Sequence, residues 1–538
     1  MKSIKKNKKK NFLLVLFFIS LIFFLLGSWF QRYEWDKKIK KYTNKTIETI
    51  TSHIYSSFIK KNKITIDIKF SNYEKLGKSK LDFIKNVKAL NEMQIKVPAK
   101  IRFNEEKMIN TKISIKGTHN DHWERERKWS FKLNLKSDGR ILDKEEFALQ
   151  HPATRGYLYE WVFMKFLEHE NLISHKIDFL ELFINGENLG LYNFTEAHTK
   201  QLLKKNRRTD GPIVFYDKQH WVKETSKINN LGANDYKDSF SKAPIRAVNS
   251  SEWLINPEKK KILNKAINLL ELFRNETLLA HEVFDVEQMS KVFAIKAILG
   301  AVEFDWKDIK FYYNPETSKL EPIGREVHVD LEQINYEPRT WWINITSNDF
   351  IHSKDQESFI ALLYKDIVFK ESYLRELNRM SNFNYYKNII NLNITEFNKF
   401  KFLLTRYFPH TRIYSEKKIK SQIKFIQDTL NPVREINAYF IEEKENYIYL
   451  NIENLQKLPI RIAGLEFEND KIKIANDKRI IKGFSLKKKN ANILKFKCNL
   501  NTKCYKMKNK KQFVTYRILG QEKKRKEAIM SWSNIKSN

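Results

Sequence analysis

The sequence has little cysteine, glycine and proline, the residues that are abundant in small disulfide-rich proteins and in fibrous proteins. Only two of its 538 residues are cysteine, 14 are glycine and 11 are proline. Two cysteines cannot build a disulfide-rich scaffold or a four-cysteine zinc site. The low glycine and proline counts exclude collagen-like chains and proline-rich or glycine-rich linkers. The chain is therefore of the ordinary globular class, and its length suits roughly two to four domains.

Several catalytic motifs are also missing. The sequence has no G-x-x-x-x-G-K-[ST], G-x-G-x-x-G, H-E-x-x-H or G-x-S-x-G pattern, which argues against Walker ATPases, Rossmann dehydrogenases, zincins and α/β-hydrolases. His119 and His122 flank Asp121 in a pattern that would suit a metal ion. Because no third strong ligand is nearby, we expect a polar loop there instead.

Acidic residues are strongly outnumbered. The chain has 99 Lys and Arg against 64 Asp and Glu, so its formal net charge is +35. A solvated, lysine-covered surface is one interpretation, and a binding surface for anionic lipid, glycan or nucleic acid is the other. Apolar residues at 42% and aromatic residues at 13% are ample for a large core.

The amino terminus carries the one long apolar run. Six lysines lie within Met1–Lys10, and Phe12–Phe30 follows without a charge. At about 1.5 Å per residue such a helix spans roughly 28 Å, close to the thickness of a bilayer core. A cleaved signal peptide has the same charge order, but the bulky residues at the end of the run favour an uncleaved signal-anchor. We expect a short cytoplasmic tail over residues 1–11 and a single pass through the bacterial cytoplasmic membrane, with the bulk of the chain outside the cytoplasm.

Four further stretches are predicted after this run. Residues 31–62 place apolar side chains at helical spacing and predict a juxtamembrane helix or stalk. Residues 63–438 form one mixed α+β domain that begins strand-rich, as the alternating runs Ile64–Phe70 and Trp129–Leu135 indicate. Its longest helical signal is Lys259–Phe273, which has one broad apolar face.

The last stretch, residues 446–538, predicts a small β-rich module of the sandwich type. Its strands are expected at Tyr447–Ile452, Leu458–Phe467 and Ile493–Cys498. Cys498 and Cys504 both fall in this module. They are either a hairpin disulfide in an oxidising compartment or two unrelated thiols, and the sequence does not decide between these.

The segment Lys128-Trp129-Ser130-Phe131-Lys132 has the pattern of a charged strand face. In a strand, its two lysines lie on one face and its two aromatic residues on the other. The lysine Cα atoms would be roughly 13 Å apart, so their long side chains could converge on one anionic ligand such as a phosphate chain. An ordinary exposed strand face is the alternative.

Carboxylates recur at the ends of later predicted strands. Ile184–Tyr192 reads as a hairpin with an Asn-Gly type I′ turn, and its returning strand leads to Glu196. Asp305 and Asp308 precede a second strand pair, and Glu326 follows it. Short strands with carboxylates at their ends are typical of a Mg²⁺–nucleotide site, where oxygen ligands hold the metal and a further carboxylate orients the attacking hydroxyl.

The order and spacing of several such segments resemble the spore-coat protein H (CotH) kinase-like family, in particular its membrane-anchored bacterial members. The segments that carry the resemblance are Ile115-Lys116-Gly117, Asp121-His122, Lys128-Trp129-Ser130-Phe131-Lys132, His151-Pro152, Arg155, Glu160-Trp161, Ile184-Asn185-Gly186, Leu189-Gly190-Leu191-Tyr192, Glu196-Ala197-His198, Arg207-Arg208, Gly211-Pro212-Ile213, Phe311-Tyr312-Tyr313-Asn314-Pro315 and Leu320-Glu321-Pro322-Ile323. The resemblance leaves the apolar run and the last module unexplained.

The resemblance implies an atypical protein-kinase-like fold that binds ATP with Mg²⁺ or Mn²⁺ and phosphorylates proteins on Ser or Thr. When the roles of the family's residues are transferred to this sequence, Lys128 or Lys132 would hold the ATP phosphates. Lys116 in the preceding turn is a further candidate. Glu196 would be the ion-pair partner that positions this lysine.

The same resemblance assigns the acids of the second strand pair. Asp308 would bind the metal and take part in catalysis, and Asp305 would be the catalytic base. Glu326 would be the second metal ligand, with Asp330 as the ligand if the strand is read a few residues later. The family pattern has Asn at the position of Asp308 and Asp at that of Glu326, and this departure raises a second hypothesis, a catalytically inactive scaffold.

The function is therefore expected to be one of three kinds. The first is a membrane-anchored extracytoplasmic kinase that transfers phosphate to a protein or envelope glycan. The second is a pseudokinase scaffold for cell-envelope assembly, and the third is a basic polysaccharide-binding protein. The expected partners are the membrane, through the N-terminal helix, and a protein or glycan acceptor, whereas nucleic acid is not expected.

Overall fold

The computed structural model describes most of the chain beyond its first 34 residues. The described residues are 35–85, 95–117, 128–136, 139–217, 240–301, 308–324, 359–467, 470–473, 480–484, 492–497 and 512–531, together with Ser20, His122 and Trp306. The predicted signal-anchor Phe12–Phe30 and the two cysteines lie outside them, apart from Ser20. Among the helices within the described ranges, none is both long enough and apolar enough to cross a membrane.

The chain divides into two compact units, residues 1–60 with 398–413 and residues 61–397 with 414–538. The first unit contains α2 (Trp35–Ser57), which confirms the helix expected there, and the later part of α15 (Ile394–Tyr407). Within this unit Tyr55 stacks on Phe402 with ring centroids 5.1 Å apart. The apolar positions that predicted the helix remain more than half exposed, so they are not what joins these helices.

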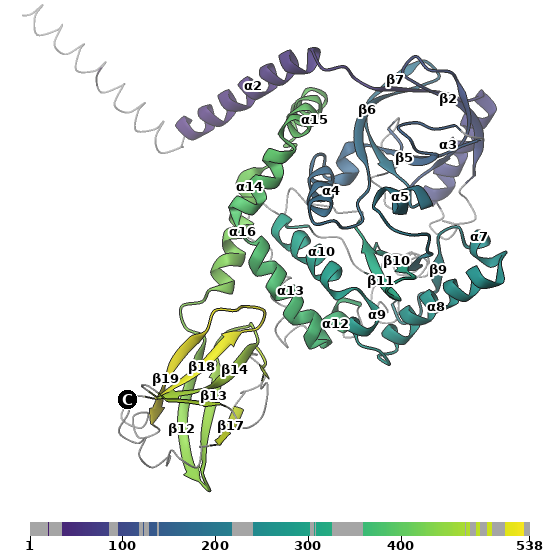
Figure 1. The fold of residues 1–538 in the computed structure, drawn as a ribbon. Coiled ribbons are helices and arrows are strands. Elements are labelled where there is room, and N and C mark those ends of the chain that lie inside the picture. The colour runs from purple at the N-terminus through teal and green to yellow at the C-terminus, as the bar shows by residue number, and fades with distance from the viewer. Residues whose placement is uncertain are drawn as a thin grey trace, which may run out of the picture. The chain divides into compact units, whose positions relative to one another are not determined.

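The second unit begins with a closed barrel in the strand order β1-β2-β3-β4-β5-β7-β6 (Figure 1). Its strands are β1 (Lys63–Asp67), β2 (Val97–Phe103), β3 (Ile109–Ile115), β4 (Phe131–Leu135), β5 (Glu146–Gln150), β6 (Ile177–Ile184) and β7 (Glu187–Glu196). The barrel closes where β1 pairs in parallel with β6, and its other neighbours pair antiparallel. Closure leaves no open sheet edge.

Alternation along the strands decides what fills the barrel. In β1, Ile64 and Ile66 are fully buried in the core cluster, while Thr65 between them lies on the opposite, outer face. The helix α3 (Phe70–Lys85) contributes Leu76 to the same cluster. The first predicted strand therefore ends at Asp67, three residues earlier than expected, because Phe70 starts α3.

The predicted Asn-Gly hairpin joins β6 and β7. Asn185 and Gly186 have φ angles of 49° and 85°, as a type I′ turn requires. The Asn185 side chain also accepts a hydrogen bond from Ile68 N–H at 2.7 Å and donates one to Ile68 O at 3.0 Å. The turn is thereby tied to the end of β1.

A second sheet of four antiparallel strands follows, in the order β11-β10-β8-β9. These strands are β8 (Ile213–Tyr216), β9 (Ile245–Ala247), β10 (Lys310–Asn314) and β11 (Lys319–Ile323). The hairpin of β10 and β11 is the strand pair expected from the sequence. Its end touches the barrel connection, since Ile323 bridges in parallel to Ile173 just before β6.

Helices surround this sheet. They are α4 (Tyr159–His169), α5 (Lys200–Lys205), α7 (Ser250–Leu254), α8 (Pro257–Arg274), α9 (Ala280–Val283), α10 (Val286–Leu299), α12 (Phe359–Lys365), α13 (Ile367–Met380), α14 (Phe383–Leu392) and α16 (Glu416–Leu430), with the short 3-10 helix η3 (Pro152–Arg155) before α4. The helix α10 is buried nearly all round and contacts α4, α13, α16 and β11. The predicted helix at Lys259–Phe273 is confirmed as α8, which begins with an Asn256 cap and Pro257.

The chain ends in a β module. Its strands are β12 (Ile436–Lys444), β13 (Tyr447–Asn454), β14 (Ile460–Phe467), β15 (Asp470–Lys473), β16 (Ile480–Ile481), β17 (Asn492–Lys497), β18 (Gln512–Ile518) and β19 (Arg525–Ser531). A parallel pair, β12 with β19, joins two antiparallel groups that share one core. The module begins at Ile436, ten residues before the expected boundary at Asn446, because β12 pairs with β13 over almost its whole length. The mixed α+β class is confirmed.

Candidate functional site

One outer surface of the barrel is polar. The register aligns Ser114, Lys132, Ala148 and Thr195 in one row across β3, β4, β5 and β7. Residues two positions away along a strand lie on the same face, so Lys116, Ser130, Gln150 and Asn193 form the next row. We call these two rows the polar face.

A chain of hydrogen bonds crosses the polar face. Lys116 Nζ donates to Gln150 Oε1 at 2.9 Å, Gln150 Nε2 donates to Thr195 Oγ1 at 3.2 Å, and Thr195 Oγ1 donates to Asn193 Oδ1 at 2.7 Å. Gln150, Asn193 and Thr195 are fully buried. The amide nitrogen of Asn193 is buried without a hydrogen-bond partner among the described residues. Such a buried donor is costly unless something accepts from it, so it marks a place for an acceptor atom.

The predicted lysine strand lies on this face. Trp129 and Phe131 point into the barrel core, as the alternation predicted, and Lys132 points out and lies 3.9 Å from Glu146 Oε2. Lys128 is half-buried and precedes β4, which begins only at Phe131. The ammonium groups of Lys116 and Lys132 thus both lie at the polar face, where Lys116 is hydrogen-bonded to Gln150 and Lys132 is close to Glu146.

The expected partnership of Glu196 needs correction. Glu196 aligns with Phe147, a barrel-core residue, whereas the neighbouring Thr195 is in the row of Lys132. Successive residues of a strand face opposite sides, so Glu196 and Lys132 lie on opposite faces of the sheet. Glu196 instead forms a buried ion pair with Lys144, which precedes β5, and accepts a hydrogen bond from the Lys176 N–H at 3.0 Å.

Two aspartates lie at the same edge of the four-stranded sheet. Because β10 runs antiparallel to β8, the start of β10 and the end of β8 lie at the same edge. Asp308 lies two residues before β10, and Asp217 directly follows β8. The strand β11 ends at the same edge, since Ile323 pairs with Lys310. We call Asp217 and Asp308 the acid edge.

Asp217 was missed by the sequence interpretation. Its side chain is buried and lies 2.7 Å from Nε of the exposed Arg246, and its N–H donates to Pro244 O at 2.7 Å. Asp308 is half-buried. The signal that could have found Asp217 is the short apolar run Ile213–Tyr216 followed at once by an acid. Paired carboxylates at strand ends offer the hard oxygen ligands that Mg²⁺ prefers.

Three predicted acids lie outside the described residues, namely Asp305, Glu326 and Asp330. The described chain approaches two of them at Gly324, directly after β11. A Cβ atom on Gly324 would be 2.4 Å from Cδ1 of Leu167 and 3.1 Å from Cε1 of Phe163, so the end of β11 packs closely on α4. Among the described residues, no three His, Cys, Asp or Glu side chains group as a metal site.

The helix α4 connects the polar face with the acid edge. Its preceding 3-10 helix begins just after Gln150 and contacts β7, while Phe163 and Leu167 of α4 lie against Gly324. Glu160 in its first turn is fully buried and lies 3.8 Å from Nε of Arg155. This pair is a second feature that the sequence interpretation left without a role. At about 1.5 Å per residue, Glu160 and Leu167 are roughly 10 Å apart along the helix.

A search with protein-family models finds a match over the region that contains these features. The model described as "CotH kinase protein" matches residues 113–384, which is half of the chain. The chain belongs to the CotH kinase family. The CotH match runs from β3 to α14 and so contains the polar face, the Lys144–Glu196 pair, α4 and the acid edge. No curated protein matches the chain.

The CotH kinase family suggests use of a nucleotide and a metal, and the described residues suit both. Lys116 and Lys132 provide cations for phosphate oxygens, and the orphaned amide of Asn193 provides a neutral donor beside them. The acid edge provides carboxylate oxygens for a divalent cation. These two sets differ in charge. The helix α4 follows the 3-10 helix that contacts β7, and its Leu167 lies against Gly324 at the end of β11.

Proposed function

We propose that this protein is an ATP- and Mg²⁺-dependent phosphotransferase that acts on a hydroxyl group of a protein Ser or Thr or of an envelope glycan. The observation that carries the proposal is that the region matching the CotH kinase family contains both the lysines of the polar face and the two aspartates of the acid edge. Phosphoryl transfer needs cations around the phosphates and carboxylates for the metal, and the two surfaces supply these separately.

The proposal gives each residue a distinct role. Lys116 and Lys132, with Lys128 beside them, bind the phosphate oxygens, and Asp217 and Asp308 hold the metal ion. Asp305, just before Asp308 in the sequence, orients the acceptor hydroxyl. Glu326 and Asp330, which follow Gly324 in the sequence, are further metal ligands. Mg²⁺ or Mn²⁺ held by these carboxylates would supply positive charge that offsets the charge of the phosphates.

We further propose that the enzyme works outside the cytoplasm, anchored by the apolar run Phe12–Phe30. The lysines before that run support this orientation. Protease added to intact spheroplasts should degrade the chain beyond about residue 31 and leave a short N-terminal fragment. Protection of the C-terminal module would contradict this orientation.

The direct test is a thermal-shift series on the full chain with ATP, with and without Mg²⁺ or Mn²⁺, followed by a measurement of ADP release with protein acceptors. A melting temperature that rises only with ATP and metal together would support the proposed site. No shift under any of these conditions would contradict it.

A catalytically inactive scaffold is the second candidate, and one observation favours it. Arg246 already occupies one oxygen of Asp217, and an arginine so placed competes with a metal ion for the carboxylate. A scaffold would bind nucleotide without turnover. ADP release separates the two, because the scaffold binds nucleotide without releasing ADP. Arg246→Ala tests whether the acid edge holds the metal, in which case metal-dependent ATP binding should strengthen.

A further inference from the structure

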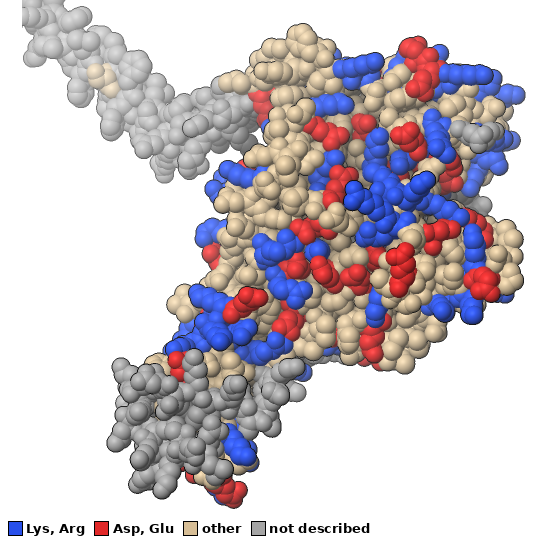
Figure 2. Space-filling model, viewed as in Figure 1, with Lys and Arg blue, Asp and Glu red and all other residues tan. Residues whose placement is uncertain are grey.

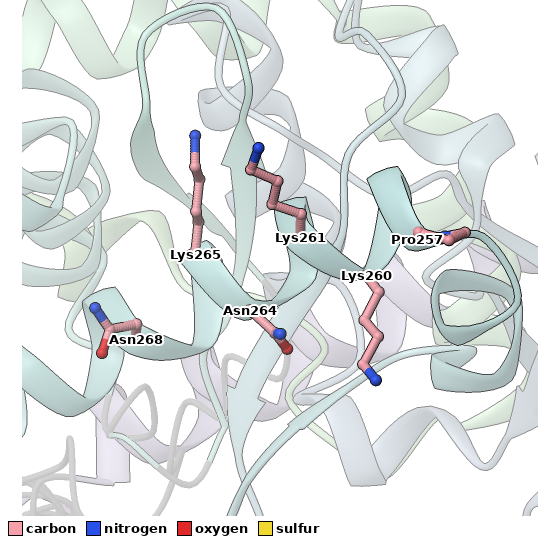
Figure 3. A pocket seen from close by; sticks show the side chains of 6 residues that line it. All are labelled: Pro257, Lys260, Lys261, Asn264, Lys265 and Asn268. Carbon is pink, nitrogen blue, oxygen red and sulfur yellow. The ribbon is translucent and has the colours of Figure 1, made fainter.

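The helix α8 has two unlike faces. Its buried face carries Leu263, Ala266, Leu270 and Phe273. Its exposed side carries Lys260, Lys261, Asn264, Lys265 and Asn268, which with Pro257 line a shallow hollow (Figure 3). In Figure 3, Lys261 and Lys265 extend to one side of the helix and Lys260 to the other. We call these five exposed residues the lysine face.

The charges of the lysine face are not compensated. None of its three lysines forms an ion pair with any residue in the part of the chain that the structure describes. Nearby lysines are different, because Lys200 and Lys259 share the carboxylates of Asp210 and Glu252. Lys and Arg also gather over α5, which contains Lys200, in Figure 2. Among the described residues, these three lysines are thus left without an ion-pair partner, although Glu258 lies on the same helix.

The helix leads from this surface to the acid edge. The Tyr216 hydroxyl donates to Leu270 O at 2.8 Å, and Tyr216 is the residue before Asp217. Arg274, at the end of α8, donates from Nη1 to Ala243 O at 2.5 Å, next to the Pro244 that bonds Asp217. Lys265 precedes Arg274 by nine residues, which is about 13 Å along the helix.

We propose that the lysine face docks an acidic segment of a polypeptide acceptor and guides its reacting hydroxyl toward the acid edge. This inference rests on the proposed function. The three lysines pair with carboxylates, and the amides of Asn264 and Asn268 both donate to and accept from a peptide backbone. A polypeptide in this position carries its Ser or Thr along α8 toward Asp217.

Two exposed apolar side chains next to the lysine face also favour a polypeptide as the ligand. Leu254 and Ile255 lie just before α8, with 52% and 83% of their surface exposed. An acidic peptide with an apolar side chain uses these residues, the lysines and the amides together. Asn264 and Asn268 also favour a peptide, since a peptide backbone offers an amide both hydrogen-bond donors and acceptors.

The test uses the full chain and a fluorescein-labelled, glutamate-rich peptide with one serine, followed by fluorescence anisotropy without ATP. Lys260→Glu, Lys261→Glu and Lys265→Glu together should weaken binding about tenfold or more, since each exposed pair contributes modestly and repulsion is added. The matched control, with the same change in net charge, is Lys100→Glu, Lys417→Glu and Lys497→Glu, three exposed lysines on other elements. It should bind like the unaltered chain at physiological salt.

The same variants separate this inference from the proposed function. With active enzyme, the α8 variant should raise KM for the acidic peptide about tenfold and leave KM for ATP unchanged. If the chain never transfers phosphate, the anisotropy experiment still tests the docking surface alone. Equal binding by the α8 variant and its control would overturn the proposal. So would α8-dependent binding to phosphatidylglycerol vesicles or to an anionic glycan without α8-dependent binding of the peptide.

Discussion

The polar face of the barrel and the acid edge of the four-stranded sheet are built in different ways. The polar face rests on aligned barrel strands, and a continuous hydrogen-bond chain fixes its buried side chains. The acid edge uses residues just outside strands, Asp217 after β8 and Asp308 before β10. The cationic half of the proposed site is therefore rigid, whereas the acidic half depends on how strand ends are held.

The two regions also differ in how well water reaches their buried charges. Glu196 is fully buried with Lys144, so neither charge has water to stabilise it. Asp217 is buried too, but its partner Arg246 is mostly exposed. Removing one charge of the pair should therefore lower the free energy of unfolding strongly at the barrel and only slightly at the acid edge.

The largest effect is expected at the barrel. Glu196→Gln leaves Lys144 buried without its counter-charge and should lower the free energy of unfolding by about 3 kcal/mol, measured by urea denaturation. Adding Lys144→Met should recover part of the loss, because the unpaired charge is then gone. Glu145→Gln is the control, since Glu145 is exposed and its ion pair with Arg140 contributes little. If Glu196→Gln and Glu145→Gln lowered the free energy of unfolding equally, the expected difference between the buried and the exposed ion pair would be refuted.

The second-largest effect on stability is expected where Gly324 packs on α4. Gly324→Ala puts a methyl group within 2.4 Å of Leu167 and should cost about 1–3 kcal/mol of unfolding free energy. It should also weaken ATP–Mg²⁺ binding, since the end of β11 must shift. Gly77→Ala in α3 is the control: its methyl group meets nothing nearer than 4.0 Å, and alanine favours a helix, so stability should rise by about 0.5–1 kcal/mol.

At the acid edge, binding should change more than stability. Asp217→Asn should weaken Mg²⁺-dependent ATP binding about tenfold, as isothermal titration would show, while the free energy of unfolding falls by less than about 1 kcal/mol. Asp308→Asn should be milder, because the amide keeps one oxygen ligand and restores the residue that the family resemblance implies. The acid edge would lose its proposed role if both variants bound ATP–Mg²⁺ like the unaltered chain.

The smallest effect concerns Lys370 in α13, a half-buried lysine that, unlike Lys144, has no carboxylate partner among the described residues. Burial, with Lys482 nearby, lowers the pKa of Lys370 in α13 to about 8. An unfolded lysine titrates near 10.4, so between about pH 8 and 10.4 the unfolded chain binds more protons and this group makes stability rise with pH. Lys370→Met should remove that rise in pH-dependent thermal melts, whereas Lys417→Met on an exposed site should not. A rise that persists in Lys370→Met would assign it to other groups.

The sequence determined the parts that depend on local pattern. The apolar spacing of α8, the Asn185-Gly186 turn and the alternation of Trp129 and Phe131 are properties of short segments, and each appears in the structure as expected. The family resemblance also came from the order of such segments, and the CotH match supports it.

Only the tertiary structure decided which charges face each other. Strand register puts Glu196 on the opposite face from Lys132, and the pairing of β5 with β7 brings it to Lys144, a turn residue without any distinctive motif. Antiparallel pairing of β8 with β10, strands almost a hundred residues apart, brings Asp217 to the same edge as Asp308. Contacts of this kind depend on pairing between distant strands, and a single sequence carries no local signal for that pairing.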